Sequence, residues 1–225
     1  MMNASKETRS QMVIAVDGPS GSGKSSISRE SAKRLGFSFL DTGAMYRALT
    51  IYFLRQTDSQ RSVTNFSPVD VNLSISIDPE REIVEINNID VTKEIRSEEV
   101  TKNVSHFAAI PEIRNFLVLK QREIVSSSKN GIVVEGRDIG SVVIPDADLK
   151  LFITASEEKR AARRALQMNS NVEDVLNQQK IRDKLDSERT ISPLTIPKDA
   201  VILDNSELDF EQSVKKFIDL VVNHD

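Results

Sequence analysis

A run of small and polar residues near the N-terminus has the composition of a loop that binds phosphate. The sequence GPSGSGKS, residues 18–25, matches the pattern G-x-x-x-x-G-K-[ST]. Glycines let backbone N–H groups approach an anion closely and accept the backbone angles of such a nest. Lys24 can reach the β- and γ-phosphates of a nucleoside triphosphate, and the Ser25 hydroxyl can ligate Mg²⁺. A glycine-serine loop with a chance lysine is the alternative.

The segment FLDTGAMYR, residues 39–47, is a second place where polar residues follow an apolar run. It places Asp41, Thr42 and Gly43 at the entry of a predicted helix, and Arg47 about one turn further on. A guanidinium group at that position can bind a phosphate with two parallel hydrogen bonds. An ordinary N-cap role for Asp41 or Thr42 is an equally good explanation of those two residues.

The segment VVEGRDIGS, residues 133–141, repeats this design after another apolar run. Glu135, Arg137 and Asp138 follow the predicted strand, with a turn at Gly136. Ligands of open α/β sheets bind at the carboxyl ends of the strands, so these side chains are candidates for a binding site. A solvated charged turn is the plainer alternative, and the buried strand that precedes the turn argues against it.

Arg182, Asp186 and Arg189 share one face of a predicted helix, because they are spaced four and three residues apart. Taken alone, this spacing is more typical of ion pairs on a solvated face. Taken with the lysine-bearing loop and the arginines above, it predicts phosphoryl transfer, which must neutralise charge on donor and acceptor. A signalling GTPase would need a guanine-binding motif such as N-K-x-D, and the sequence contains none.

Short apolar runs alternate with helical patterns and indicate the elements that position these residues. Continuous apolar runs are typical of strands covered on both faces, as in a parallel sheet. The candidate strands lie at residues 12–16, 37–40, 132–134, 149–153 and 200–203. Apolar residues recur at helical spacing over residues 44–53, 113–124 and 210–221. The alternation predicts a doubly wound α/β core.

Residues 62–100 interrupt this alternation and predict a small antiparallel insertion. Apolar and polar residues alternate over residues 71–78, as in a half-buried strand, and a second strand is predicted at residues 82–86. Turns are expected at residues 78–81, which include a proline, and at Asn87 and Asn88.

The composition narrows the classes of partner and location. A net charge of −4 argues against binding a nucleic-acid backbone, which usually needs a basic excess. The chain has no cysteine, which fits a reducing compartment. Residues 1–11 lack the apolar region of a secretory signal, and no apolar run is long enough for a membrane span. We therefore expect a cytoplasmic protein with small-molecule partners, and a monomer because no heptad pattern is present.

Four stretches together resemble the bacterial cytidylate kinase family of P-loop nucleoside monophosphate kinases. They are IAVDGPSGSGKSS, FLDTGAMYRALT, EGRDIGS and DAVILDNSELDFEQ. The resemblance covers nearly the whole chain and is weakest before residue 11 and over residues 55–95. It implies a parallel five-stranded sheet flanked by helices, a small β insertion and a mobile helical lid, with Mg-ATP-dependent phosphorylation of CMP and dCMP in pyrimidine metabolism.

The resemblance also implies roles for individual residues. Lys24, Arg137 and Arg189 would be catalytic. ATP would be bound by Gly18, Pro19, Ser20, Gly21, Ser22, Gly23, Lys24, Ser25 and Ser26, with Ser25 as the Mg²⁺ ligand. The acceptor would be bound by Asp41, Thr42, Gly43, Arg47, Ser105, Arg114, Arg137, Asp138, Arg182, Asp186 and Arg189. Among these, Arg47, Arg137 and Arg189 would hold the CMP phosphate, Arg182 and Asp186 the ribose, and Ser105, Arg114 and Asp138 the cytosine. Thr42 and Glu135 stand where other members have serine and aspartate, which leaves the role of Glu135 open.

These expectations divide the chain into an N-terminal tail without structure, residues 1–11, and one kinase domain, residues 12–225. The core would comprise residues 12–60, 101–155 and 190–225, with the insertion at about 62–100 and the lid at about 156–189. The arginine-rich part of the lid is residues 156–171. Two alternatives stay open: another small-molecule P-loop kinase, such as a UMP/CMP or dephospho-coenzyme A kinase, and a nucleotide-binding regulatory module without turnover.

Overall fold

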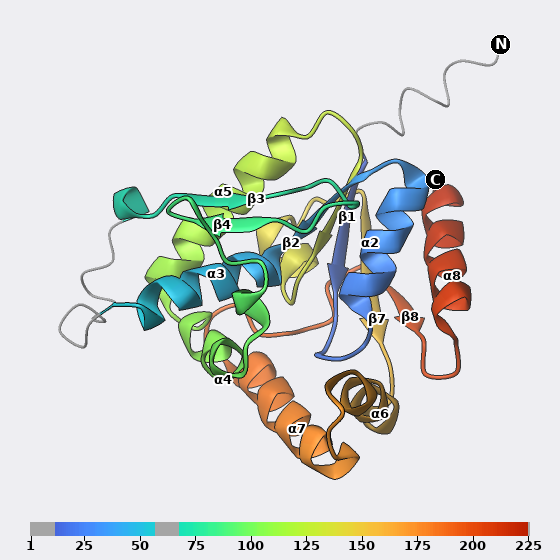
Figure 1. The fold of residues 1–225 in the computed structure, drawn as a ribbon. Coiled ribbons are helices and arrows are strands. Elements are labelled where there is room, and N and C mark those ends of the chain that lie inside the picture. Colours follow the sequence, from blue (N-terminus) through green and yellow to red (C-terminus); the bar gives the residue numbers. More distant parts are fainter. Residues whose placement is uncertain (1–11, 57–67, 225) are drawn as a thin grey trace.

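The five predicted strands form one parallel sheet in the order β2-β6-β1-β7-β8 (Figure 1). The computed structural model describes residues 12–56 and 68–224, so the predicted tail and residues 57–67 lie outside the described residues. The strands are β1 (Val13–Asp17), β2 (Ser38–Asp41), β6 (Ile132–Glu135), β7 (Leu149–Thr154) and β8 (Val201–Asp204). Each begins within one residue of its predicted start, and the predicted fold class is confirmed.

Alternate residues of each strand face two separate hydrophobic cores, because successive side chains of a strand point to opposite faces. Ala15 of β1 packs toward the side covered by α3 (Thr42–Leu54) and α5 (Pro111–Ser127). Its neighbours Ile14 and Val16 pack toward the opposite side, where α2 (Lys24–Leu35) and α8 (Phe210–Val222) lie (Figure 1). This burial on both faces explains why the strands are continuous apolar runs.

The predicted insertion is an antiparallel sheet of three strands, β3 (Leu73–Ile75), β4 (Val84–Ile86) and β5 (Ile89–Asp90). The first predicted strand, residues 71–78, was too long. The last backbone hydrogen bond toward the β4 side runs from Ser76 to Ile83, at 2.9 Å, just before the turn that begins at Asp78, and Ile77 on the other edge accepts the N–H of Phe39 of β2 at 2.9 Å. The third strand was not predicted, and it begins directly after the predicted turn at Asn87 and Asn88, which have φ angles of 51° and 62°.

Two short 3₁₀ turns, Pro68–Asp70 and Glu94–Arg96, flank the insertion, and α4 (Glu98–Phe107) follows it. A π-helical turn, Ile139–Val143, follows β6. Phe53 of α3 stacks on Phe107 of α4, with ring centroids 5.1 Å apart. The insertion and α4 are therefore attached to the same side of the sheet as α3.

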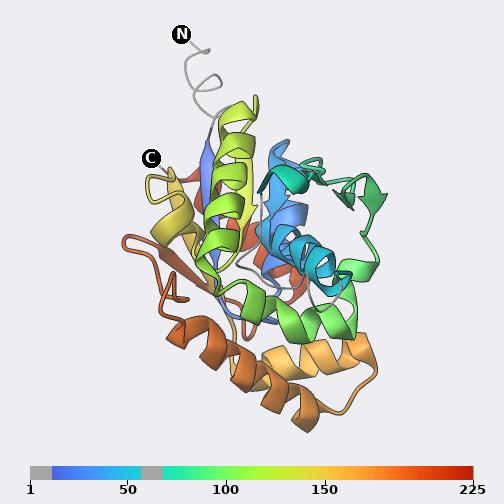
Figure 2. The same cartoon turned by 90° about the vertical axis from the view of Figure 1, so that its left-hand side faces the viewer.

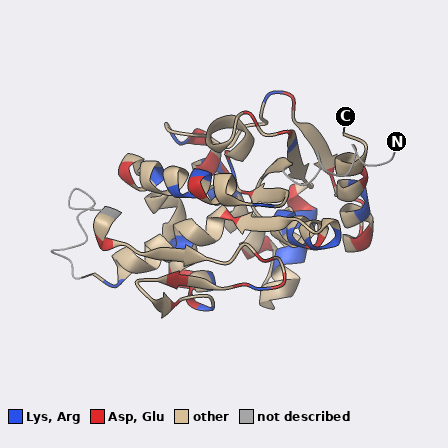
Figure 3. Cartoon of the chain, turned by 90° about the horizontal axis from the view of Figure 1, so that it is seen from above, with Lys and Arg blue, Asp and Glu red and all other residues tan. Residues whose placement is uncertain are grey.

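The predicted lid is a pair of helices, α6 (Glu157–Met168) and α7 (Val172–Glu188), with a small core of Ala161, Ala165 and Val175 between them. Both views place the pair beyond the carboxyl ends of the strands (Figures 1 and 2). Basic and acidic residues are interspersed on the helices (Figure 3). Within the described ranges, the helices are all too short or too polar to cross a membrane.

Candidate active site

The P-loop joins β1 to α2 and needs its glycines for space. Gly18 has a φ of 147°, and a Cβ atom there would lie 2.0 Å from the carbonyl oxygen of Ile153. Gly23, with a φ of 83°, precedes the helix. The Oγ of Ser22 is buried and has no hydrogen-bond partner among the described residues. The loop backbone and the Ser22 hydroxyl therefore lie at the N-terminus of a 12-residue helix. The N-terminus of a helix favours the binding of an anion.

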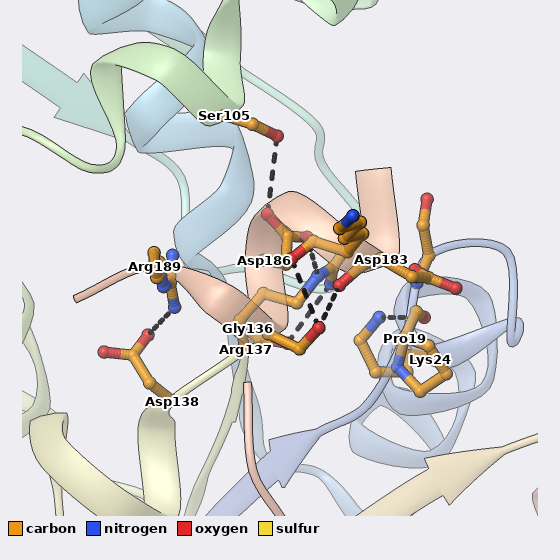
Figure 4. Close-up of polar contacts among 12 residues, drawn as sticks. Pro19, Lys24, Ser105, Gly136, Arg137, Asp138, Asp183, Asp186 and Arg189 are labelled. Carbon is orange, nitrogen blue, oxygen red and sulfur yellow. Dashed lines mark hydrogen bonds and ion pairs between the residues drawn. The ribbon is translucent and has the colours of Figure 1, made fainter. Parts of the chain in front are cut away.

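Lys24 is the first residue of α2, and its side chain folds back over the loop. Its Nζ donates to the carbonyl oxygen of Pro19 at 3.0 Å and lies 3.4 Å from Oε1 of Glu135 (Figure 4). Burial, and then the charge of Arg137, lower the pKa of Lys24 to about 8. A buried ammonium group held by only one carboxylate favours the approach of further negative charge.

Ser25 and Glu135 meet where α2 begins and β6 ends. The Ser25 hydroxyl donates to Oε2 of Glu135 at 3.0 Å, while Ser26, one residue on, is exposed. Glu135 is itself buried. Its carboxylate therefore contacts two side chains of the P-loop, Lys24 and Ser25, and lies 3.9 Å from Nη1 of Arg137.

The carboxyl end of β2 meets that of β6 through Thr42. Its hydroxyl donates to the backbone oxygen of Glu135 at 2.7 Å. Asp41 is the N-cap of α3, because its Oδ1 accepts the N–H of Ala44 at 2.9 Å, and Gly43 lies beside it. Burial, and then the charge of Glu135, raise the pKa of Asp41 to about 6. The N-cap explanation of Asp41 is therefore confirmed, and any contact with a ligand is additional.

Arg47 lies inside the protein between α3 and the end of the insertion. Its Nη1 donates to the backbone oxygen of Ile95 at 2.8 Å and to Oγ1 of Thr101 at 3.0 Å. Burial, and then the charge of Arg182, lower the pKa of Arg47 to about 9. The pKa of Arg182 is lowered to about 10 by burial and then by Arg137. The guanidinium groups of Arg47, Arg137 and Arg182 therefore repel one another, although they come from α3, the turn after β6 and α7.

Asp186 of α7 lies between Arg137 and Ser105 (Figure 4). Its Oδ2 accepts from Nε of Arg137 at 3.1 Å, and its Oδ1 accepts from the hydroxyl of Ser105 at 3.4 Å. Burial favours the neutral acid, but Arg137, Arg182 and Arg189 outweigh it and hold the pKa of Asp186 below its usual range. The carboxylate is ionised and joins α4, α7 and the turn after β6.

Asp138 pairs with two arginines deep in the same region. Its Oδ2 accepts a short hydrogen bond from Arg114, and Nη2 of Arg189 lies 3.5 Å from its Oδ1. Asp138 and Arg114 are 4% and 3% exposed. The ion pairs of Asp138 within the described chain go to Arg114 and Arg189. Asp138 therefore balances the charges of these two arginines.

A family model described as cytidylate kinase matches residues 14–223 of this sequence. This chain belongs to the cytidylate kinase family. Relatives named cytidylate kinase include one from Nocardia farcinica, 46% identical over 90% of both chains, and one from Caldanaerobacter subterraneus, 44% identical over 92% of this chain and 93% of the relative. A third, from Streptomyces avermitilis, is 42% identical over 98% of this chain and 97% of the relative.

Two solved structures share the fold of this cytidylate kinase family member at low sequence identity. An uncharacterized protein from Eubacterium ventriosum has a TM-score of 0.56 at 13% identity, covering 95% of this chain and 99% of that one. A gluconokinase from Sinorhizobium meliloti has a TM-score of 0.51 at 16% identity, covering 95% and 93%. These similarities show the fold alone.

The structure brings all the sequence-predicted site residues to the carboxyl edge of the sheet or to the elements that cover it. It also adds Asp17, which the sequence analysis passed over. This buried carboxylate at the end of β1 accepts the N–H groups of Ile139 and Gly140 at 2.7 and 2.8 Å. Asp17 therefore fixes the turn that carries Asp138. Its position at the end of a predicted strand was the available signal.

Two arginines of α6 are used differently from what their place in a lid suggests. Arg163 donates to the side-chain and backbone oxygens of Asn205 at 2.9 and 2.7 Å. Arg160 donates to the backbone oxygens of Ala155 and Ser20. These guanidinium groups therefore hold α6 to the P-loop and to the segment after β8.

Proposed function

We propose that this member of the cytidylate kinase family transfers the γ-phosphoryl group of ATP to CMP and dCMP, giving CDP and dCDP, with Mg²⁺ bound. The observation that carries the proposal is the pair of cationic sites at one edge of the sheet. Lys24 and the P-loop backbone form the first cationic site. Arg47, Arg137 and Arg189 form the second cationic site. Two adjacent anion sites neutralise donor and acceptor while holding them in line.

On the donor side, the loop of residues 18–26 would hold the ATP phosphates, through the backbone N–H groups of its residues other than Pro19. Bound Mg-ATP supplies the reactive phosphorus and a cation that neutralises its oxygens. The fit is supported by the glycine cradle and the unpartnered Ser22 hydroxyl. Ser25 would ligate Mg²⁺, since its proton is directed to Glu135 and its lone pairs are left for a cation. Lys24 lies beside the loop and would place its charge on the transferring group.

On the acceptor side, Arg47, Arg137 and Arg189 would hold the CMP phosphate. Burial lowers the pKa of Arg47 first, and then the charges of Arg182, Arg96 and Arg137 lower it further; burial also lowers the pKa of Arg189, against the opposing charge of Asp138. A phosphate between them would relieve that repulsion. Asp41, Thr42 and Gly43 line the same strand edge and would border this phosphate.

The nucleoside would be recognised by residues of the acceptor side that pair with one another in this structure. Arg182 and Asp186 would meet the ribose hydroxyls, and Ser105, Arg114 and Asp138 would meet the cytosine. Cytosine offers an N4–H₂ donor, which an ionised Asp138 accepts, whereas uracil offers an acceptor that the carboxylate repels. A buried site built to hydrogen-bond its substrate discriminates strongly against a ligand that lacks the partner.

An acceptor panel separates this proposal from its alternatives. ADP release would be followed by a coupled assay with ATP and CMP, dCMP, UMP, AMP, GMP or dephospho-coenzyme A. We expect CMP and dCMP to exceed AMP and GMP in kcat/KM by at least about 10²-fold, as a hydrogen-bonding base site predicts. Turnover only with another acceptor would indicate a different P-loop kinase. ATP binding without acceptor-dependent ADP release would indicate a regulatory module.

The position of Glu135 gives a prediction for Mg²⁺. Glu135→Gln keeps the shape but weakens the acceptor that orients the Ser25 hydroxyl, so the Mg²⁺ concentration for half-maximal rate should rise about tenfold. Initial rates at fixed ATP and varied Mg²⁺ measure this. Glu30→Gln is the control, because Glu30 is a half-buried carboxylate of α2 that pairs with Arg34. An unchanged Mg²⁺ requirement in Glu135→Gln would separate Glu135 from the metal.

The proposal includes a cytoplasmic monomer. Absence of cysteine supports a reducing compartment, and the expected substrates are small molecules. Sedimentation of the purified chain at two concentrations tests the monomer directly.

A further inference from the structure

We infer that Arg160, Gln179 and Asp183 form a dock that holds the two lid helices on the P-loop and positions the acceptor-side residues of α7. None of the three is among the proposed ATP or CMP contacts. The inference rests on the proposed function only for its kinetic measurements. Below, "the dock" means these three side chains together with Ser20 and Gly21.

Both backbone polar groups of Ser20, its N–H and its carbonyl oxygen, are hydrogen-bonded to the lid. Its N–H donates to Oδ1 of Asp183 at 3.2 Å, and its carbonyl oxygen accepts from Nη1 of Arg160 at 2.8 Å. The same Nη1 lies 2.5 Å from Oδ2 of Asp183. One ion pair, formed between the two lid helices, therefore holds two consecutive peptide groups of the loop, those on either side of the Ser20 Cα.

The second contact of the dock lies at Gly21, where the absence of a side chain leaves room for Gln179. Its φ is 77°, and a Cβ atom there would lie 2.4 Å from Nε2 of Gln179. That amide donates in turn to the backbone oxygen of Arg160 at 3.3 Å. Gln179 and Arg160 are 6% and 5% exposed. The lid thus packs against the loop where a side chain would block it.

The dock lies on the helix that carries the acceptor-side residues. Gln179 and Asp183 are four residues apart and share one face of α7. Arg182 adjoins Asp183 in the chain, and Asp186 follows three residues later. Figure 4 shows Asp183 between Asp186 and the P-loop residues. Because a helix moves as a unit, the contact at Ser20 sets the distance between the P-loop and the acceptor-side residues Arg182 and Asp186.

A fixed distance between these two sites matters for the reaction. Phosphoryl transfer needs the donor and acceptor phosphates in line, and a misplacement of about 1 Å can cost on the order of 10²-fold in rate. The side chains of Arg160, Gln179 and Asp183 are therefore positioning residues. They act through the loop and through α7 and not on the substrates.

The first test is Asp183→Ala, with Asp174→Ala on the exposed first turn of the same helix as the matched control. We expect Asp183→Ala to lower kcat with CMP by about tenfold or more and to raise the KM for CMP. The affinity for ATP alone, measured by calorimetry, should change less than about threefold. Asp183→Glu, which keeps the carboxylate, should recover part of kcat. Asp174→Ala should behave as the parent protein.

Limited proteolysis of the connection between α6 and α7, residues 169–171, tests the dock without turnover. Asp183→Ala should be cleaved faster than the parent and should gain less protection from ATP plus CMP. Gln179→Ala, which removes no charge, should also raise the cleavage rate and reduce the protection by ATP plus CMP, each by about threefold.

Parent-like kcat, KM and cleavage in Asp183→Ala would overturn the dock. A loss of kcat in Asp183→Ala with no change in the cleavage rate would also overturn the dock. A loss of kcat accompanied by a large fall in the thermal midpoint would overturn it too. If the parent protein fails to phosphorylate CMP, the proposed function is wrong. The cleavage comparison still tests the dock in that case.

Discussion

Replacing Lys24 with alanine should lower kcat for CMP phosphorylation by about 10²-fold or more. The lysine is a buried, preorganised positive charge beside the P-loop, and deleting one such contact typically costs that much in rate. The fold should survive, because the side chain contacts the loop carbonyl and a carboxylate and not the apolar core. Steady-state kinetics with ATP and CMP, together with a thermal melt, measure both effects.

Lys33→Ala is the matched control for this prediction. Lys33 lies on the same helix, is partly exposed and pairs with Glu80 at 2.9 Å on the insertion. An exposed ion pair contributes little, so kcat should stay within about twofold. Near-normal turnover in Lys24→Ala would contradict the assignment of the P-loop as the ATP site.

The second large effect is expected for Asp138→Asn. The change keeps the shape but replaces a charge-assisted acceptor between Arg114 and Arg189 with a neutral amide. We expect kcat/KM for CMP to fall by about 10²-fold, since two buried guanidinium groups lose their counter-charge. UMP should lose less, because the amide can turn its NH₂ toward the uracil O4. The CMP/UMP ratio should therefore fall by about tenfold, or about 1.4 kcal/mol.

Kinetics with both monophosphates, and a thermal melt of each variant, decide between base recognition and a purely structural role. Asp146→Asn, an exposed position after the π-helical turn, is the control and should leave the ratio unchanged. If Asp138 serves only to hold its two arginines, both substrates will suffer equally. An unchanged ratio would thus remove Asp138 from base recognition.

Much of the fold was predictable because its strands are buried on both faces. Such strands are continuous apolar runs, and all five were predicted to within one residue at each start. The P-loop was predictable for a different reason, since its glycines answer a local steric need that the sequence records directly. The two-residue strand β5 was missed, because so short a segment is fixed by its pairing with β4 and not by its own pattern.

The site was predictable as a set of residues but not as a set of pairs. Positions at strand ends indicated which side chains reach the sheet edge. Nothing local indicates that Asp183 bonds Ser20, 163 residues away in the chain, or that Asp17 holds the turn after Asp138. Contacts of that kind depend on how the elements pack against one another, and local sequence patterns do not indicate that packing.

The hydrogen bond from Phe39 to Ile77 also covers part of an edge of the main sheet. β2 is an edge of the sheet, and the unpaired backbone of an edge strand can template pairing with another chain. The insertion occupies that edge at its middle. Deleting the insertion to probe substrate recognition would therefore also uncover an aggregation-prone strand. Loss of activity in such a variant would report on both changes at once.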